Sequence, residues 1–262
     1  MKHLICTDID GTLINDQEQV TPKTRQALER RIKLGDLFIP VSARMPEAID
    51  TVASDIGEHY PMISYNGALL LDEHDHEISS HPFKIERALK ILSIVEENYP
   101  DVSWNVYRGH NWFSNKLPGT LEEEKIVQVE STKVSIQDIE KLPECHKILL
   151  IGTAQEIDEL QTKLRAIYPV LDIVKSKPTL LEIMAKGINK GSGVKEMISH
   201  YQIPADYVWV FGDNYNDVQM LQAVKHSVAM GNASDDVKKQ TAYVTDSNND
   251  DGIAKILNKY LG

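Results

Sequence analysis

The chain has 262 residues, more than one typical domain, which predicts either a single large α/β unit or two domains. Its 28 Lys and Arg against 39 Asp and Glu give a net charge of −11, which argues against a general affinity for nucleic acid or an anionic membrane. Cys6 and Cys145 make no metal-binding spacing and indicate no disulfide framework. No apolar stretch approaches the length of a membrane span and no signal peptide precedes the first strand, so we expect a cytoplasmic protein.

The first part of the chain alternates strands and helices. The apolar run at residues 3–7 predicts a buried strand that ends at Asp8. The elements expected after it are a helix over 20–34 that starts at Thr21-Pro22, a strand over 37–41, a helix over 46–56 and a strand over 62–65. This βαβαβ order predicts a parallel sheet whose ligands gather at the carboxyl ends of the strands, where Asp8, Ser42 and Asn66 stand.

The pattern changes after Gly67. Residues 69–71 and 78–80 predict a hairpin, and its connection, Glu73-His74-Asp75-His76-Glu77, is better interpreted as a solvated turn than as a metal site. The segment from Phe83 onward predicts helices over 85–97 and 154–167 and strands over 102–107, 146–151, 171–174 and 180–184. These elements predict a second, α+β domain inserted into the first.

The alternation of strands and helices resumes at Ile188. Lys190-Gly191 precedes a helix, and the apolar strand over 207–211 ends in Gly212-Asp213-Asn214-Tyr215-Asn216-Asp217. The remaining elements are a helix over 218–223, a strand over 227–230, another helix, a strand over 243–245 and a terminal helix over 252–260. Two acidic clusters at strand ends can meet across a parallel sheet, and such a group of oxygen ligands suits Mg²⁺.

The first cluster contains two carboxylates, Asp8 and Asp10, at the end of a buried strand. Carboxylates are costly there unless a cation or a substrate compensates their charge. The Gly11-Thr12 turn offers backbone N–H groups and a hydroxyl to the same place, so phosphate and metal can share it.

Each candidate also has a purely structural interpretation. Asp-Gly and Asn66-Gly67 are common turns, Lys190 can be a solvated residue near a helix start, and Ser42 can cap the helix at Pro46. Asp213 and Asp217 can be first-turn acids of a helix. A site is favoured because all of these residues are expected at one edge of one sheet.

The motifs together resemble a known family. Asp8-Ile9-Asp10-Gly11-Thr12-Leu13, Ser42 with Arg44, Lys190-Gly191, and the Gly212–Asp217 segment resemble, in chain order, the four motifs of the haloacid dehalogenase superfamily of phosphotransferases. Met230-Gly231-Asn232-Ala233, Asp250-Asp251-Gly252-Ile253-Ala254 and the inserted segment are similar to its Cof-type sugar-phosphatase branch. The resemblance implies a Rossmann-like doubly wound parallel sheet core over 1–82 and 186–262, with an inserted α+β cap over 83–185 that sets substrate specificity.

The resemblance also implies a Mg²⁺-dependent phosphatase that works through an aspartyl phosphate. Asp8 is then the nucleophile, Asp10 the general acid and base, and Lys190 the cation between phosphate and nucleophile. Mg²⁺ is then held by Asp8, the carbonyl of Asp10 and Asp213. The remaining implied roles are phosphate or substrate binding by Thr12, Ser42, Ala43, Arg44, Asn66 and Asn216, and orientation of Lys190 or of a water by Asp217. Ala43 departs from the glycine common in this branch, which restricts the backbone beside Ser42.

Substrate and partners follow from the same interpretation. A cap over the site implies that the substrate is a small phosphorylated metabolite such as a sugar phosphate. We expect neither nucleic acid nor a membrane as a partner, and we expect a monomer or homodimer. The aromatic residues of one expected cap hairpin can stack on such a substrate but are better explained as core: Trp104, Tyr107 and Trp112. Two alternative functions stay open. One is a phosphomutase or phosphotransferase of the same superfamily, and the other is a non-catalytic phosphate-binding regulatory module.

Overall fold

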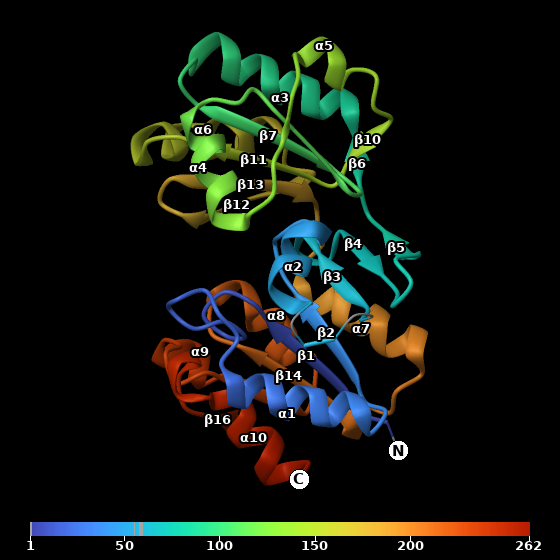
Figure 1. Cartoon of the computed structure of the whole chain (residues 1–262). Helices are drawn as coiled ribbons and strands as arrows, with labels where there is room; N and C mark the ends of the chain where they lie inside the picture. The colour runs from blue at the N-terminus through green and yellow to red at the C-terminus, as the bar shows by residue number, and fades with distance from the viewer. Residues whose placement is uncertain (1, 55, 58–59) are drawn as a thin grey trace. The chain divides into compact units, whose positions relative to one another are not determined.

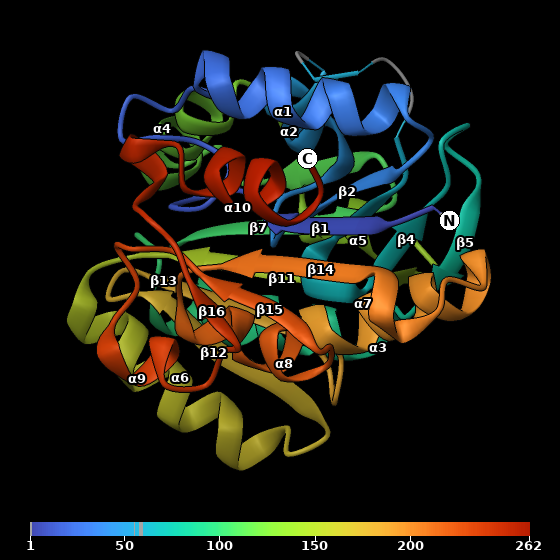
Figure 2. The same ribbon diagram turned by 90° about the horizontal axis from the view of Figure 1, so that it is seen from below.

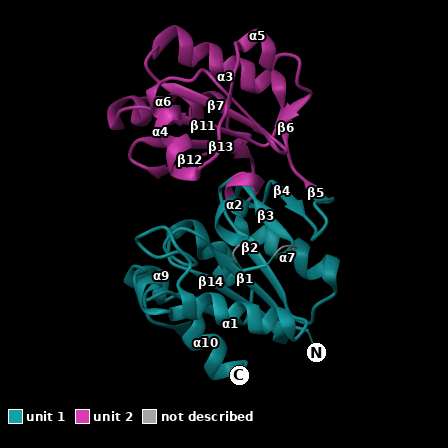
Figure 3. Ribbon diagram, in the orientation of Figure 1, with its two compact units in different colours: residues 1–44, 49–79, 189–262 teal, residues 45–48, 80–188 magenta. Residues whose placement is uncertain are grey.

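The computed structural model describes residues 2–54, 56–57 and 60–262. The chain divides into two compact units, shown in different colours in Figure 3. Unit 1 comprises Met1–Arg44, Ile49–Ser79 and Asn189–Gly262, and unit 2 comprises Met45–Ala48 and Ser80–Ile188. Unit 2 therefore extends a few residues beyond the 83–185 range expected for the inserted domain, and it includes a short segment that follows Arg44.

Unit 1 contains a mainly parallel eight-stranded sheet with the strand order β16-β15-β14-β1-β2-β3-β4-β5. β1 is central and every one of its residues is buried, which explains its uninterrupted apolar character. β3 and β4 pair antiparallel, so the parallel part ends at β3. The strands are β1 (Leu4–Asp8), β2 (Leu37–Val41), β3 (Met62–Ser64), β4 (Leu69–Leu71), β5 (Glu77–Ser80), β14 (Val208–Gly212), β15 (His226–Ala229) and β16 (Tyr243–Val244).

Helices cover both faces of this sheet, as Figures 1 and 2 show. α1 (Pro22–Lys33) and α10 (Gly252–Tyr260) lie side by side on one face. α7 (Lys190–Tyr201), α8 (Val218–Gln222) and α9 (Asp235–Lys238) supply apolar side chains to the core on the other face. The doubly wound arrangement expected from the alternating pattern is confirmed.

Local sequence signals explain several element ends in unit 1. The hydroxyl of Thr21 accepts a hydrogen bond from the backbone N–H of Thr24, so α1 begins at Pro22 as its Thr-Pro pair predicts. α2 (Pro46–Ala53) is shorter than the predicted helix over 46–56, of which Asp55 lies outside the described residues. β3 stops one residue early because a 3₁₀ turn, Tyr65–Gly67, takes over with Asn66 at φ 54°.

Unit 2 is built on a six-stranded sheet with the order β12-β13-β11-β7-β8-β9. Its helices α3 (Ile85–Asn98) and α6 (Ala154–Ile167) pack their apolar side chains against one face of that sheet. The strands are β7 (Ser103–Arg108), β8 (Asn111–Ser114), β9 (Thr132–Lys133), β11 (Lys147–Ile151), β12 (Leu171–Lys177) and β13 (Leu180–Ala185), and β6 (Phe83–Lys84) pairs separately with β10 (Glu144–Cys145). The expected α+β character is therefore present.

Two short helices of unit 2 have no counterpart among the predicted elements: α4 (Pro118–Val127) and α5 (Ile136–Ile139). Within α4 only Thr120 and Val127 are buried, so the segment lacks the apolar periodicity on which a helix prediction depends.

The three aromatic residues to which the core interpretation applies, Trp104, Tyr107 and Trp112, are buried. Trp104 belongs to the apolar core beneath α3, and its indole N–H donates to Glu96 Oε1 at 3.1 Å. Tyr107 and Trp112 stack on each other with ring centroids 5.3 Å apart. Cys6 and Cys145 are buried free thiols. None of the described helices combines the length and the apolar character that crossing a membrane requires.

Candidate active site

The two acidic clusters meet because their strands are neighbours. β1 and β14 pair in parallel with Thr7 opposite Phe211, so Asp8 and Asp213 leave the sheet at the same edge. Carboxylate oxygens of Asp8, Asp213 and Asp217 lie within 4.8 Å of one another. Among the described residues, these three carboxylates are the group that lies close enough together to hold a metal ion. The Glu73–Glu77 connection contributes no residue to such a group.

This three-carboxylate cluster carries an excess of negative charge. The Asp8 residue is only 5% exposed and Asp217 is completely buried. Burial raises the pKa of Asp8 well above its ordinary value, and the neighbouring Asp217 raises it further, while Lys190 opposes both. Burial and Asp217 likewise raise the pKa of Asp213 to about 6 against the hydrogen bond from Thr12. A buried cluster of carboxylates with raised pKa values favours the binding of a cation.

Lys190 places one cation inside the cluster. It is the first residue of α7, which is capped by Asn189, and its side chain is 1% exposed. Its Nζ lies 2.5 Å from Oδ1 of Asp8 and 2.6 Å from Oδ1 of Asp217. Burial alone would lower the pKa of Lys190, but the charges of Asp217 and Asp8 outweigh it and raise the pKa above its ordinary value. One ammonium offsets the charge of only one of the three carboxylates, so the remaining negative charge suits a divalent cation.

Asp217 fixes both the lysine and the turn after β14. Its Oδ2 accepts hydrogen bonds from the backbone N–H groups of Asp213, at 2.9 Å, and Asn214, at 3.0 Å. With Oδ1 on Lys190, both carboxylate oxygens accept hydrogen bonds from the protein. These contacts hold Lys190 Nζ and the backbone of the turn in fixed positions relative to each other.

The turn after β1 is built around Gly11. Its φ of +79° is in the left-handed region, and a Cβ there would lie 2.5 Å from Oδ2 of Asp213. The Thr12 hydroxyl donates to Oδ1 of Asp213 at 2.9 Å, so this hydroxyl holds a carboxylate of the second cluster.

Asn232 is a further member of the site to which the sequence assigned no role. Its Nδ2 donates to the carbonyl of Gly11 at 2.8 Å and to Oδ2 of Asp213 at 3.3 Å, and its Oδ1 accepts from the N–H of Asn248. The feature of the sequence that could have identified Asn232 is its place in the Met230–Ala233 stretch, which resembles the Cof-type branch.

A second group of predicted residues lies at the ends of β2 and β3. The Oγ of Ser42 accepts from the N–H of Arg44 at 3.2 Å, and its carbonyl accepts from the N–H of Asn66 at 2.8 Å. Ala43, between them, is half-buried. The guanidinium of Arg44 contacts Asp10, whose side chain is 61% exposed.

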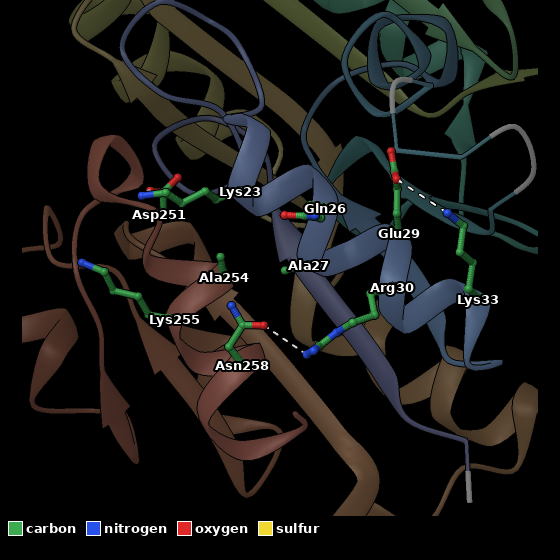
Figure 4. A pocket seen from close by; sticks show the side chains of 10 residues that line it. All are labelled: Lys23, Gln26, Ala27, Glu29, Arg30, Lys33, Asp251, Ala254, Lys255 and Asn258. Atoms are coloured by element: carbon green, nitrogen blue, oxygen red, sulfur yellow. Dashed lines mark hydrogen bonds and ion pairs between the residues drawn. The ribbon is translucent and has the colours of Figure 1, made fainter.

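Hydrogen bonds thus link most of the predicted site residues in two groups. One consists of Asp8, Thr12, Lys190, Asp213 and Asp217, and the other of Asp10, Ser42, Arg44 and Asn66. Asn216 is different, since it lies exposed in the 3₁₀ turn Tyr215–Asp217. Unit 1 also has an open hollow of about 730 Å³ between α1 and α10, shown in Figure 4. Its lining residues, which include Lys23, Arg30 and Lys255, contain none of the predicted site residues.

Comparison with known proteins agrees with this geometry. The sequence profile of the haloacid dehalogenase-like hydrolases matches residues 5–257. A relative from Haemophilus influenzae is 32% identical over 260 residues, covering 98% of this chain and 97% of its own. A 5-amino-6-(5-phospho-D-ribitylamino)uracil phosphatase of Bacillus subtilis is 27% identical, with 98% of this chain and 95% of its own covered. The crystal structure of a haloacid dehalogenase-like hydrolase from Bacteroides thetaiotaomicron superimposes with a TM-score of 0.90 at 26% identity, covering 99% of each chain.

The chain therefore belongs to the haloacid dehalogenase-like hydrolases. Within them it is a Cof-type phosphatase, a phosphoric monoester hydrolase whose relatives act on small phosphorylated molecules.

Proposed function

We propose that the protein hydrolyses phosphate monoesters of small metabolites, sugar phosphates or similar compounds, in a Mg²⁺-dependent reaction through an aspartyl phosphate on Asp8. The observation that carries the proposal is the buried contact of Asp8 with Lys190 beside two further carboxylates. A dianionic phosphoryl group approaches a carboxylate only where cations neutralise both partners in a preorganised site.

The acidic cluster fits a divalent metal ion. It carries more negative than positive charge, and burial together with the neighbouring Asp217 raises the pKa values of Asp8 and Asp213. Asp8, the backbone carbonyl of Asp10 and Asp213 would hold the ion, with oxygen ligands that suit Mg²⁺. A bound ion supplies positive charge between the phosphoryl group and the nucleophile.

The reaction has two halves. In the first, an oxygen of Asp8 forms a bond to phosphorus, the bond to the ester oxygen breaks, and Asp10 gives that oxygen a proton. In the second, water attacks phosphorus, Asp10 takes its proton, and the bond between Asp8 and phosphorus breaks to release phosphate. Lys190 stabilises the charge on Asp8 and on the phosphoryl group throughout.

Hydrogen-bond donors complete the proposed phosphoryl site. Ser42, Ala43 and Asn66 at the ends of β2 and β3, with Asn216 and the turn around Thr12, are the candidates for contact with phosphoryl oxygens. Asp217 orients Lys190 and is not assigned to the metal.

Unit 2, taken as the cap, is proposed to determine which phosphate ester is hydrolysed. The relative that acts on a phosphoribitylamino compound supports a polyhydroxylated small substrate for this chain too. We also retain the expectation of a cytoplasmic protein. A second expectation is that the protein is a monomer or homodimer, and light scattering of the purified protein would test this oligomeric state.

The central test is hydrolysis of p-nitrophenyl phosphate with Mg²⁺ and with EDTA, for the wild type and for Asp8→Asn. We expect metal-dependent release by the wild type alone, together with a phosphorylated Asp8 trapped by acid quenching. Equal release by both proteins would refute the assignment of Asp8. A panel of phosphorylated metabolites, compared by kcat/KM, then identifies the substrate class. Transfer of the phosphoryl group to a sugar instead of water would indicate the phosphomutase alternative.

A further inference from the structure

The turn that follows β1 is held partly by its own backbone. The carbonyl of Ile9 accepts from successive N–H groups of the turn, those of Thr12, Leu13 and Ile14. The carbonyl oxygens of Gly11 and Ile14 accept from side-chain amides that lie 221 and 234 positions further along the chain. The conformation of the turn therefore depends on segments that are far from β1 in the sequence.

Asn232 and Asn248 supply these two amides. Nδ2 of Asn232 donates to the carbonyl of Gly11 at 2.8 Å, and Nδ2 of Asn248 donates to the carbonyl of Ile14 at 2.9 Å. The two asparagines are also joined to each other, because the backbone N–H of Asn248 donates to Oδ1 of Asn232 at 3.2 Å. Both ends of the turn are therefore held by one connected network of hydrogen bonds.

This network reaches the residues that are proposed to hold the metal ion. Nδ2 of Asn232 also donates to Oδ2 of Asp213 at 3.3 Å, and the Thr12 hydroxyl donates to Oδ1 of Asp213 at 2.9 Å. The backbone carbonyl of Asp10 belongs to the same peptide group as the N–H of Gly11, so the position of the turn determines the direction of that carbonyl. Two of the three proposed ligands therefore lie in the turn or against it.

Gly231 allows close contact between the two segments that carry the amides. Its N–H donates to the carbonyl of Asp246 at 3.0 Å, and a Cβ on Gly231 would lie 2.7 Å from the backbone nitrogen of Ser247. A side chain at this position would push the two segments apart. Backbone contacts therefore place Asn248, which is 6% exposed, beside Asn232.

We propose that Asn248 is a positioning residue for the metal site. Through the carbonyl of Ile14 and through Asn232, it holds the turn after β1 in the conformation that presents the Asp10 carbonyl and the Asp213 carboxylate to one ion. Contacts that orient metal ligands typically contribute about 10–100-fold to metal affinity. The inference rests on the proposed function, of which the ion is a part, and it adds a residue that belongs to none of the sequence motifs and does not touch the three-carboxylate cluster itself.

Asn248→Ala tests the proposal, because it removes the amide and keeps the backbone N–H that donates to Asn232. Calorimetric titration of the substrate-free protein with Mg²⁺ should show an affinity lowered by about 10-fold, the lower end of the range for loss of an orienting contact. With p-nitrophenyl phosphate, the Mg²⁺ concentration that gives half of the maximal rate should rise by the same factor, and kcat at saturating Mg²⁺ should fall by less. A partly unfolded protein would instead lower kcat and leave that Mg²⁺ concentration unchanged.

Further variants separate positioning from stability. Asn249→Ala alters the exposed neighbouring amide, which contacts Asp16, and should bind Mg²⁺ as the wild type does. Asn105→Ala removes a buried amide of unit 2 that donates to the carbonyl of Leu149, so it should lower the free energy of unfolding and leave Mg²⁺ affinity unchanged. Asn248→Ser keeps a polar group in the buried position and serves where the alanine variant does not fold, with a loss of Mg²⁺ affinity in the same direction.

The double variant Asn232→Ala/Asn248→Ala should bind Mg²⁺ about as weakly as Asn232→Ala alone, because both side chains act on one turn. Amide hydrogen exchange in EDTA should be faster over residues 11–14 in Asn248→Ala than in the wild type. The inference alone is overturned if Asn248→Ala and Asn248→Ser bind Mg²⁺ as tightly as Asn249→Ala, if the two losses multiply in the double variant, or if exchange of the turn is unchanged. A wild type that binds no Mg²⁺ would instead refute the metal dependence in the proposed function, and the inference with it.

Discussion

Nζ of Lys190 lies 2.5 Å from a carboxylate oxygen of Asp8, although the two residues are 182 positions apart in the chain. Both side chains are almost completely removed from solvent. A buried ion pair contributes little net stability compared with apolar residues, but removal of one partner leaves the other charge uncompensated. The pair is therefore explained by chemistry on Asp8 more readily than by stability.

Lys190→Ala should lower both stability and activity. Loss of the ammonium leaves Asp8 and Asp217 as buried carboxylates without their cation, so we expect the free energy of unfolding to fall by about 3–5 kcal/mol. Turnover should fall roughly 10²–10³-fold, as for loss of a preorganised charge-stabilising donor. Urea unfolding in EDTA and steady-state kinetics measure the two effects. Lys195→Ala, exposed on the same helix, is the matched control, and equal stability of the two variants would contradict the prediction.

In the metal-free protein, Asp213 should lower the free energy of unfolding in a pH-dependent way. Its pKa is raised by burial and by Asp217 to about 6 from an ordinary 3.8. Protonated Asp213 therefore contributes its full stabilisation of the fold when the pH is below the ordinary pKa. This contribution is lost as pH rises through about 6.

Asp213→Asn, which stays neutral, should therefore be more stable than the wild type at about pH 7.5 and lose about half of that advantage at about pH 5. Unfolding free energies in EDTA at both pH values test this, with Asp101→Asn, exposed in unit 2, as the control. An advantage that is the same at both pH values would disprove the assignment to Asp213.

Gly11→Ala should damage the metal site as well as the fold. The positive φ strains any residue with a Cβ, at a cost of about 1–3 kcal/mol, and here the new methyl group also displaces the Asp213 carboxylate. Gly35 separates the two effects, because its φ is +93° but nothing lies within 4 Å of an added Cβ. We expect Gly35→Ala to lower the unfolding temperature without changing Mg²⁺ affinity measured by calorimetry. The prediction fails if Gly11→Ala binds Mg²⁺ as tightly as Gly35→Ala.

Asn232→Ala should weaken Mg²⁺ binding. Its amide ties the carbonyl of Gly11 to the Asp213 carboxylate, and loss of such an orienting contact typically costs about 10–100-fold in metal affinity. Asn98→Ala is a suitable comparison, since that exposed amide donates only within α3, to the carbonyl of Ile94. Calorimetric titration with Mg²⁺ would disprove the role of Asn232 if both variants bound alike.

Much of unit 1 could be predicted from local pattern. The apolar run of β1, the Thr21-Pro22 start of α1 and the alternation of elements are signals carried by neighbouring residues. The edge position of Asp8, Ser42 and Asp213 then followed from the geometry of parallel strands. α4 of unit 2 could not be predicted in this way, because few of its residues are buried and its sequence has no clear apolar face.

The sequence by itself therefore determined the class of fold, the family and the residue types that carry the chemistry. Only the tertiary structure decided their pairing: Lys190 between Asp8 and Asp217, Thr12 on Asp213, and Arg44 on Asp10. Periodicity and turn signals act over a few residues, so they can be read along the chain. Ion pairs between distant segments depend on which charges are buried together, and that depends on how the whole sheet assembles.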